Sequence, residues 1–193
     1  VYKRQCLGSI TPGSTSNYPR SLDIHNGHLY AGTNRGLFTQ NLSNGASKMC
    51  PGTNRNEWRY SYTITGSGNY LYSNYNRRMY RGTLTSSGSN LCPTSVKNYY
   101  DSTMSYGYGM TAHPTNPNEL YFMSRGRNSI YKITVNSNGT GRTINWQKGK
   151  YGYNKQSTST QNYFYYPWGI HYDDDNDRLI VSGYSAKKIQ VFN

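Results

Sequence analysis

Short runs of apolar and β-branched residues recur along the whole chain, and a cluster of Gly, Asn, Asp or Pro separates each run from the next. Aromatic and β-branched runs bounded by turn residues are the sequence signature of β-strands. No segment of useful length shows the 3.6-residue periodicity of an amphipathic helix. The pattern therefore predicts an all-β protein.

The runs also repeat in a fixed order. Residues 36–51 align without a gap on residues 78–93, and two weaker copies follow around residues 120–131 and 179–189. The first strands of the four copies are predicted at residues 21–24, 61–64, 109–112 and 169–172. The second strands are predicted at residues 28–32, 70–73, 119–123 and 178–183, and the third at 37–42, 79–84, 130–135 and 189–192. Fourth strands are less regular and are predicted at residues 96–100 and 143–147.

Four strands in a unit of about 40–60 residues are typical of a propeller blade. The sequence therefore predicts a single small domain over residues 1–193, a four-bladed β-propeller. The fourth copy ends directly after its third strand, so we expect the N-terminal residues 1–10 to supply the missing outer strand. Such closure would remove an exposed sheet edge.

Two copies resemble known propeller repeats. Residues 166–170 read Tyr-Pro-Trp-Gly-Ile and residues 188–192 read Lys-Ile-Gln-Val-Phe, which resembles an NHL-type repeat. The second copy is similar to a Leu-Tyr-Trp-Thr-Asp blade, with Ser73 and Asn74 in place of the Trp-Thr-Asp core. The resemblance implies a propeller fold and no catalytic residues, because propellers carry many functions.

The composition indicates the net charge of the protein and the cellular compartment in which it functions. The chain has 21 Lys and Arg against 8 Asp and Glu, a net charge of +13, which favours polyanionic partners, although solubility alone would also explain it. Two glycosylation sequons begin at Asn41 and Asn138, the first residue is Val rather than Met, and no apolar run approaches a membrane span. These features predict a secreted, extracellular protein.

Three cysteines follow the repeat. Cys6, Cys50 and Cys92 are expected at matching places in three blades, too far apart for a disulfide, which needs Cα atoms within about 7 Å. We therefore predict that they are not bridged to one another. The odd number leaves a buried structural thiol or an oligomer joined by a bridge between chains.

The candidate binding residues lie in two kinds of loop that share one face of a propeller. Aromatic or basic residues two positions apart precede each first strand: Tyr18 and Arg20, Trp58 and Tyr60, Tyr106 and Tyr108, Tyr166 and Trp168. Cations occupy every turn between the second and third strands: Arg35, Arg77, Arg78, Arg125, Arg127, Lys187 and Lys188. Aromatic rings stack on sugars or bases, and Arg pairs with carboxylate, sulfate or phosphate. The alternative is that the aromatics form inter-blade core and the cations are ordinary turn charges.

Signals for catalysis or a metal site are few. The acidic run at residues 173–177 lies in a first-to-second strand turn, on the opposite face, and lacks the spacing of a calcium loop. The four histidines are too dispersed for a compact metal site, although His171 could line the channel with Asp23 and Thr111. We expect no enzyme activity, no cofactor and no metal.

The sequence favours a secreted lectin-like module that binds glycans or acidic polysaccharide through its basic, aromatic face. The alternative is a Tyr-rich structural or adhesive protein of the extracellular matrix, for which the 22 tyrosines and the odd cysteine would serve cross-linking. Nucleic acid is a less favoured partner, because the charge supports it but the secretion signals do not.

Overall fold

The computed structural model describes residues 18–50, 58, 60–85, 92–149, 164–184 and 187–193. Within these residues the regular structure consists of β-strands and one 3-10 turn, η1 (Arg125–Arg127). The prediction of an all-β fold is confirmed. The predicted closure by residues 1–10 lies outside the described residues.

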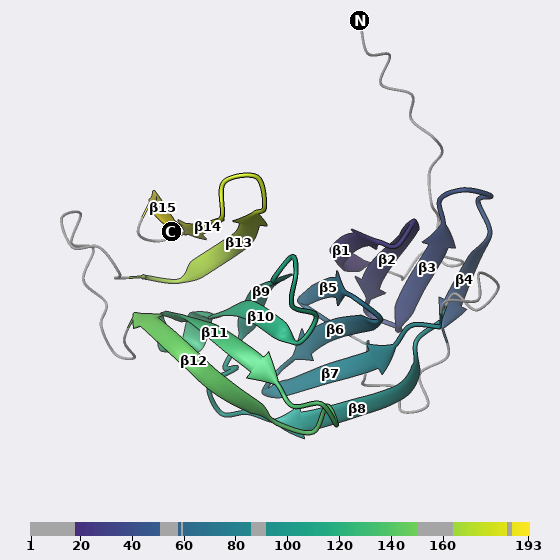
Figure 1. Ribbon diagram of the computed structural model, residues 1–193, viewed down its shortest axis with the longest axis horizontal. Helices are drawn as coiled ribbons and strands as arrows, with labels where there is room; N and C mark the ends of the chain where they lie inside the picture. The colour runs from purple at the N-terminus through teal and green to yellow at the C-terminus, as the bar shows by residue number, and fades with distance from the viewer. Residues whose placement is uncertain (1–17, 51–57, 59, 86–91, 150–163, 185–186) are drawn as a thin grey trace, which may run out of the picture.

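The strands form four antiparallel sheets, each in the order of its strands along the chain, which are the four blades of a β-propeller (Figure 1). Blade 1 contains β1 (Pro19–His25), β2 (His28–Thr33), β3 (Leu37–Asn41) and β4 (Ser47–Cys50). Blade 2 contains β5 (Thr63–Ser67), β6 (Tyr70–Tyr75), β7 (Arg78–Thr83) and β8 (Thr94–Tyr100). Blade 3 contains β9 (Gly107–Ala112), β10 (Glu119–Ser124), β11 (Ser129–Val135) and β12 (Arg142–Gly149). Blade 4 contains β13 (Pro167–Asp173), β14 (Arg178–Gly183) and β15 (Lys188–Phe192).

The turns within a blade follow local sequence. Between β1 and β2, His25 pairs with His28, and the two intervening residues Asn26 and Gly27 have φ angles of 48° and 73°. Asn-Gly is the preferred pair for such a hairpin, because both central residues must adopt positive φ. The sequence predicted most strands to within a few residues but missed β4, and it placed the start of β5 two residues too early.

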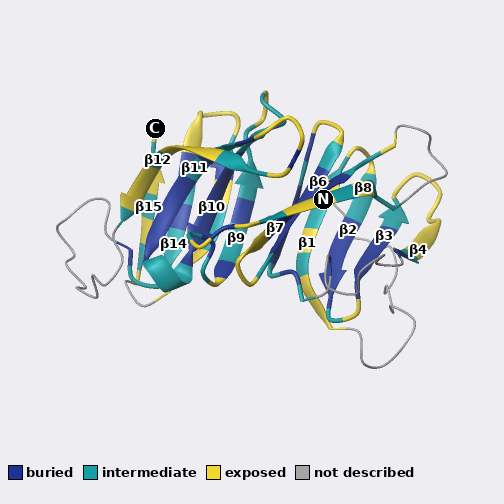
Figure 2. Ribbon diagram, turned by 90° about the horizontal axis from the view of Figure 1, so that it is seen from below, coloured by how far each residue is buried: buried dark blue, intermediate teal, exposed yellow. Residues whose placement is uncertain are grey.

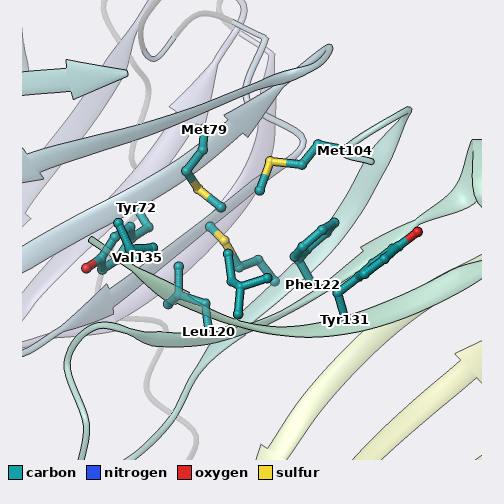
Figure 3. Close-up of a cluster of buried hydrophobic side chains, with 9 residues drawn as sticks. Tyr72, Met79, Met104, Leu120, Phe122, Tyr131 and Val135 are labelled. Carbon is teal, nitrogen blue, oxygen red and sulfur yellow. The ribbon is translucent and has the colours of Figure 1, made fainter. Parts of the chain in front are cut away.

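Adjacent blades pack through their inner strands, β1 against β5, β5 against β9 and β9 against β13. Buried clusters fill the three junctions, and the cluster between blades 2 and 3 interleaves Tyr72 and Met79 with Leu120 and Phe122 (Figure 3). Burial is deepest on middle strands such as β2, β3, β10 and β11, whereas β4, β12 and β15 carry exposed residues (Figure 2). The core is therefore a series of inter-blade layers.

Tyrosine supplies part of this core. Tyr72 and Tyr131 are among the largest fully buried side chains. The Tyr72 hydroxyl donates a 2.9 Å hydrogen bond to the carbonyl of Pro117, which ties blade 2 to a turn of blade 3. Burial is the main cause that raises the pKa of Tyr72 to about 12. A buried ring with a bonded hydroxyl explains how a chain of low apolar content makes a core.

An ion pair also joins blades 2 and 3. Asp101, which follows β8, accepts hydrogen bonds from Nε and Nη2 of Arg142 at the start of β12, the latter at 2.8 Å. Thr103 donates to the same carboxylate through its backbone and its hydroxyl. Burial would raise the pKa of Asp101, but the bonds from Arg142 and Thr103 together hold it below its usual value.

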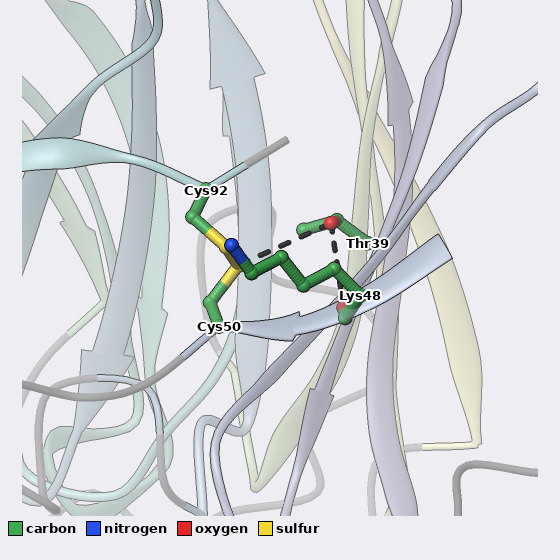
Figure 4. Close-up of a disulfide and its surroundings, with 4 residues drawn as sticks. All are labelled: Thr39, Lys48, Cys50 and Cys92. Atoms are coloured by element: carbon green, nitrogen blue, oxygen red, sulfur yellow. Dashed lines mark hydrogen bonds between the residues drawn. A yellow bond between two sulfur atoms is a disulfide. The ribbon is translucent and has the colours of Figure 1, made fainter. Parts of the chain in front are cut away.

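The cysteine prediction was wrong for one pair. Cys50 and Cys92 form a disulfide, with Cα atoms 5.4 Å apart (Figure 4). The gap-free repeat alignment misled because the turn before the outer strand is longer in blade 2. Cys50 therefore ends β4, whereas Cys92 precedes the start of β8, so the two residues are not structurally equivalent and meet at the junction of blades 1 and 2. Cys6 lies outside the described residues.

Candidate binding face

Cross-strand pairing identifies equivalent positions in the four blades. Leu22, Ile64, Met110 and Ile170 each face the fourth residue of the second strand of their own blade. We call the residues two positions before Leu22 and its equivalents the central row: Arg20, Tyr62, Tyr108 and Trp168. We call the residues two positions before the central row the entry tyrosines: Tyr18, Tyr60, Tyr106 and Tyr166.

The central row is continuous across the four blades. The Arg20 guanidinium lies 5.7 Å from the centroid of the Tyr62 ring. The centroids of Tyr62 and Tyr108 are 4.8 Å apart, and Tyr108 stacks on Trp168 at 5.0 Å with 17° between the planes. One side chain from each blade therefore contributes to a single row of π surfaces.

Three of the four entry tyrosines have a backbone conformation that few residues adopt. Tyr60, Tyr106 and Tyr166 have φ angles of 58°, 51° and 51°. The carbonyls of Tyr106 and Tyr166 accept hydrogen bonds from the backbone of Arg125 and Tyr184, at 3.1 and 3.0 Å. Positive φ in a bulky residue costs free energy and persists only where the surrounding structure fixes it. These bonds link the entry loop to the turn between the second and third strands of the same blade.

The end of β6 adds Tyr75 to the face, and the turns after β10 and β14 add Arg125 and Tyr184. Tyr75 lies beside Tyr62 with centroids 6.3 Å apart, and Tyr184 lies 5.7 Å from Trp168. Sequence reasoning missed three aromatic members of this face, Tyr62, Tyr75 and Tyr184. Aligning the copies on the pattern Tyr-x-Tyr or Tyr-x-Trp would have found Tyr62.

Arg125 is held among aromatic rings. Its guanidinium carbon lies 4.6 Å from the centroid of Tyr166, 5.2 Å from Tyr108 and 5.5 Å from Trp168. Within the described residues its guanidinium makes no hydrogen bond to a protein acceptor. Cation–π contact favours this position, by about 0.5–2 kcal/mol depending on solvent exposure. The N–H groups of this guanidinium remain available to an anion.

A channel opens beneath the central row. The cavity of about 310 Å³ is lined by all four inner strands, with Tyr62, Tyr108 and Trp168 among its lining residues. Asp23, Thr111 and His171 line it as well, as the sequence suggested. Asp23 Oδ2 accepts a 2.6 Å hydrogen bond from the backbone N–H of Gly66, and burial outweighs this bond and raises the pKa of Asp23.

A second, polar groove of about 440 Å³ lies over blade 2 and is lined in part by Tyr75 and Tyr106. Two of the predicted cations, Arg77 and Arg78, belong to it. Arg77 donates to the hydroxyl of Tyr100 at 3.2 Å, and Arg78 to Asn98 Oδ1 at 3.0 Å. Because Tyr75 also contacts the central row, the groove adjoins the candidate binding face.

The other predicted residues divide between turn positions and core. Arg35 lies in the β2–β3 turn, and Arg127 donates to the carbonyl of Ser102 at 3.0 Å. Lys187 directly precedes β15, and Lys188 is its first residue. The place of these four residues in the binding site stays a prediction.

Trp58 was predicted as a stacking residue and is instead core. Its side chain is only 3% exposed and packs with Leu37 and Ile64 between blades 1 and 2. Gly82 makes room for it, since a Cβ there would lie 2.9 Å from the Trp58 ring. The predicted pair of blade 2 was displaced by two residues, and the correct pair is Tyr60 and Tyr62.

Among the described residues no group of three or more His, Cys, Asp or Glu side chains is placed to hold a metal ion. The acidic run lies in the β13–β14 turn, where the Tyr172 hydroxyl donates to Asp177 and Asn176 donates to Asp173. In the same part of the chain, no helix is long and apolar enough to cross a membrane.

Four radially arranged sheets around a lined channel define this chain as a β-propeller. It matches no protein-family model and no curated protein. Among solved structures it is similar to a chain of the nidogen/laminin complex, with a TM-score of 0.64 and 14% identity over 92% of this chain and 61% of that chain. It is also similar to an auxiliary nutrient-binding protein from Bacteroides thetaiotaomicron, with a TM-score of 0.64 and 16% identity over 90% and 47% of the two chains.

The computationally designed Ika4 protein matches over 94% of this chain and 93% of its own, with a TM-score of 0.57 and 9% identity. This chain spans only about half to three fifths of the two natural proteins described above. At these identities the similarities confirm the propeller fold and leave the repeat family unassigned.

Proposed function

We propose that this protein is a non-catalytic binding module that takes an anionic or multivalent glycan on the face formed by the central row and Arg125. The observation that carries the proposal is the position of Arg125 among Tyr108, Tyr166 and Trp168, with its N–H groups unused by described protein acceptors. Arg presents a planar fork that fits a carboxylate or sulfate through two hydrogen bonds.

The aromatic rings of this face would contribute stacking contacts to the sugar rings of the ligand. Trp168 is 48% exposed, and Tyr106 and Tyr184 are more exposed still. The apolar C–H face of a sugar ring can pack on such surfaces while its hydroxyls bond to the tyrosine hydroxyls. Equivalent positions in four blades would contact a repeating polymer at several points, and multivalency raises its apparent affinity.

The net charge of +13 adds long-range attraction for acidic chains. We further propose an extracellular location. The Cys50–Cys92 disulfide supports it, because such bonds persist in oxidising compartments and are rare in the cytosol.

The experiment measures binding to heparin, hyaluronan, neutral dextran and duplex DNA at low and at physiological salt. Sulfated or carboxylated polysaccharide should bind more tightly than dextran, and Arg125→Ala should weaken it about tenfold, since hydrogen bonds to charged groups contribute about 1.5–3 kcal/mol. Arg178→Ala is the matched control, because Arg178 starts β14 beside the acidic turn, away from the central row. Equal binding of all four polymers by the parent and both variants would refute the proposal. Tighter binding to DNA than to any polysaccharide would redirect it to nucleic acid.

A structural or adhesive role is the second candidate. Tyr18, Tyr100, Tyr106 and Tyr184 are between 58% and 70% exposed, which makes their phenols accessible to oxidative coupling. Peroxidase treatment should then give dityrosine-linked multimers, and their absence would count against this candidate.

A further inference from the structure

The three junctions between blades follow one rule. Each blade has a leading face, which packs on the preceding blade, and a trailing face, which packs on the next. On the leading face, Ile64 of blade 2 is 4% exposed and Met110 of blade 3 is 6% exposed. On the trailing face, Leu37, Met79 and Ile130 of blades 1, 2 and 3 are all at most 1% exposed.

The leading face of blade 1 has the same apolar character but no blade against it. Leu22, the equivalent of Ile64 and Met110, is 64% exposed, and Ile24 on the same side of β1 is 62% exposed. A groove of about 380 Å³ runs beside Leu22 and is lined further by Leu29 and Phe38. This surface therefore resembles the leading half of a blade junction that lacks its trailing partner.

The trailing face of blade 4 is also apolar and exposed. Ile189 faces the fifth residue of β14, just as Leu37, Met79 and Ile130 face the fifth residue of their second strands. Ile189 is nevertheless 70% exposed, and Val191 on the same side of β15 is 54% exposed. Exposed apolar patches of this kind mark interaction sites.

We propose that the trailing face of blade 4 docks on the leading face of blade 1 in a second copy of this chain, so that two copies close one ring through two identical junctions. The occupant of each face is of the kind the chain already uses three times, an apolar blade face that is presented with the same strand register. Because both halves of the junction lie on one chain, two copies satisfy both faces at once. Such head-to-tail contacts make a closed ring when the rotation closes.

The curvature of the chain favours a second copy over closure within one chain. Three junctions already set the angle between successive blades, yet β13 and β1 are left apart, with the faces of blades 1 and 4 exposed (Figure 1). The chain also superposes over nine tenths of its length on only part of longer chains, 61% and 47% of the two natural structures compared above. The exposed faces of blades 1 and 4 are therefore open to a second copy.

The test is the mass of the full chain in solution, measured by light scattering over a concentration series in high salt, which suppresses contacts driven by charge. We expect a species of twice the 22.0 kDa of one chain. Leu22→Glu and Ile189→Glu should each give monomer, while Leu42→Glu should leave the dimer intact, because Leu42 is 49% exposed but lies in the β3–β4 turn. Unchanged circular dichroism spectra would show that the variants fold.

Mixing the two variants tests the head-to-tail arrangement. A Leu22→Glu copy keeps an intact blade 4 face and an Ile189→Glu copy keeps an intact blade 1 face, so a mixture can form one unaltered junction. The mixture should therefore regain dimer that neither variant forms alone. The proposal would be overturned by a monomeric parent or by open-ended oligomers. It would also be overturned by a dimer that Leu22→Glu leaves intact, because such a dimer could form by pairing of the β15 edges alone.

Discussion

Tyr108 and Trp168 stack across the junction of blades 3 and 4, with ring centroids 5.0 Å apart and planes 17° apart. The two residues occupy the same position in successive blades, and the Arg125 guanidinium lies within 5.5 Å of both ring centroids. A structural repeat thus places π surfaces and a cation at one point above the channel. We expect the exposed Trp168 to act in binding and the buried Trp58 to act in stability.

The two tryptophans of the predicted site should therefore behave differently. Trp168→Ala should weaken heparin binding with little change in salt dependence, because it removes stacking worth about 1–3 kcal/mol by analogy with base stacking. Trp58→Ala should instead lower the free energy of unfolding by about 3–5 kcal/mol, because Trp58 is core. Binding isotherms and urea melts of both variants provide the measurement. A large stability loss in Trp168→Ala with binding unchanged would contradict the assignment.

Replacing Arg125 with Lys should distinguish directional recognition from simple charge. The ammonium keeps the positive charge but not the planar fork, so Arg125→Lys should retain the salt dependence of heparin binding and lose much of its affinity. Arg125→Ala should also lower the slope of log K against log salt by about 1. If Arg125→Lys binds like the parent, the guanidinium acts only through its charge.

The disulfide should contribute strongly to stability. It closes a loop spanning 42 residues, for which the chain-entropy model gives about 4 kcal/mol. The double variant Cys50→Ala and Cys92→Ala should lose a comparable free energy of unfolding, measured against the untreated parent. Peptide mapping under non-reducing conditions should recover the two cysteines in one linked fragment. Recovery of both as free thiols would show that the pairing is wrong.

The Asp101–Arg142 pair should make the propeller sensitive to acid. A carboxylate whose pKa is lower in the folded than in the unfolded state stabilises the fold above its unfolded pKa, near 3.8, and this contribution disappears as the pH falls through the lower folded value. Asp101→Asn should therefore cost about 3 kcal/mol at pH 7, because it leaves Arg142 without its counter-charge. The difference from the parent should shrink below about pH 4. A constant difference from pH 7 to pH 3 would exclude this pair as the cause.

The sequence by itself determined the strand content and the number of blades. Those features depend on local patterns, namely β-branched and aromatic runs, turn residues and a repeat, which are visible in one dimension. The same patterns brought Arg20, Tyr108 and Trp168 onto the shortlist of binding residues. The repeat could not show where an insertion falls, because a longer turn leaves the strand pattern on either side intact.

Only the tertiary structure decided which aromatic residue before β5 faces the channel and which faces the core. Trp58 and Tyr62 are both aromatic and both precede β5, but Gly82 of a neighbouring strand creates the space that buries Trp58. Cys50 and Cys92 meet because a blade junction brings the end of β4 next to the residues before β8. Sequence spacing fixes the position of a residue along a strand, whereas its neighbours across a junction depend on how whole blades pack. The exposure of Leu22 and Ile189 likewise appears only when the curvature of all four blades is known.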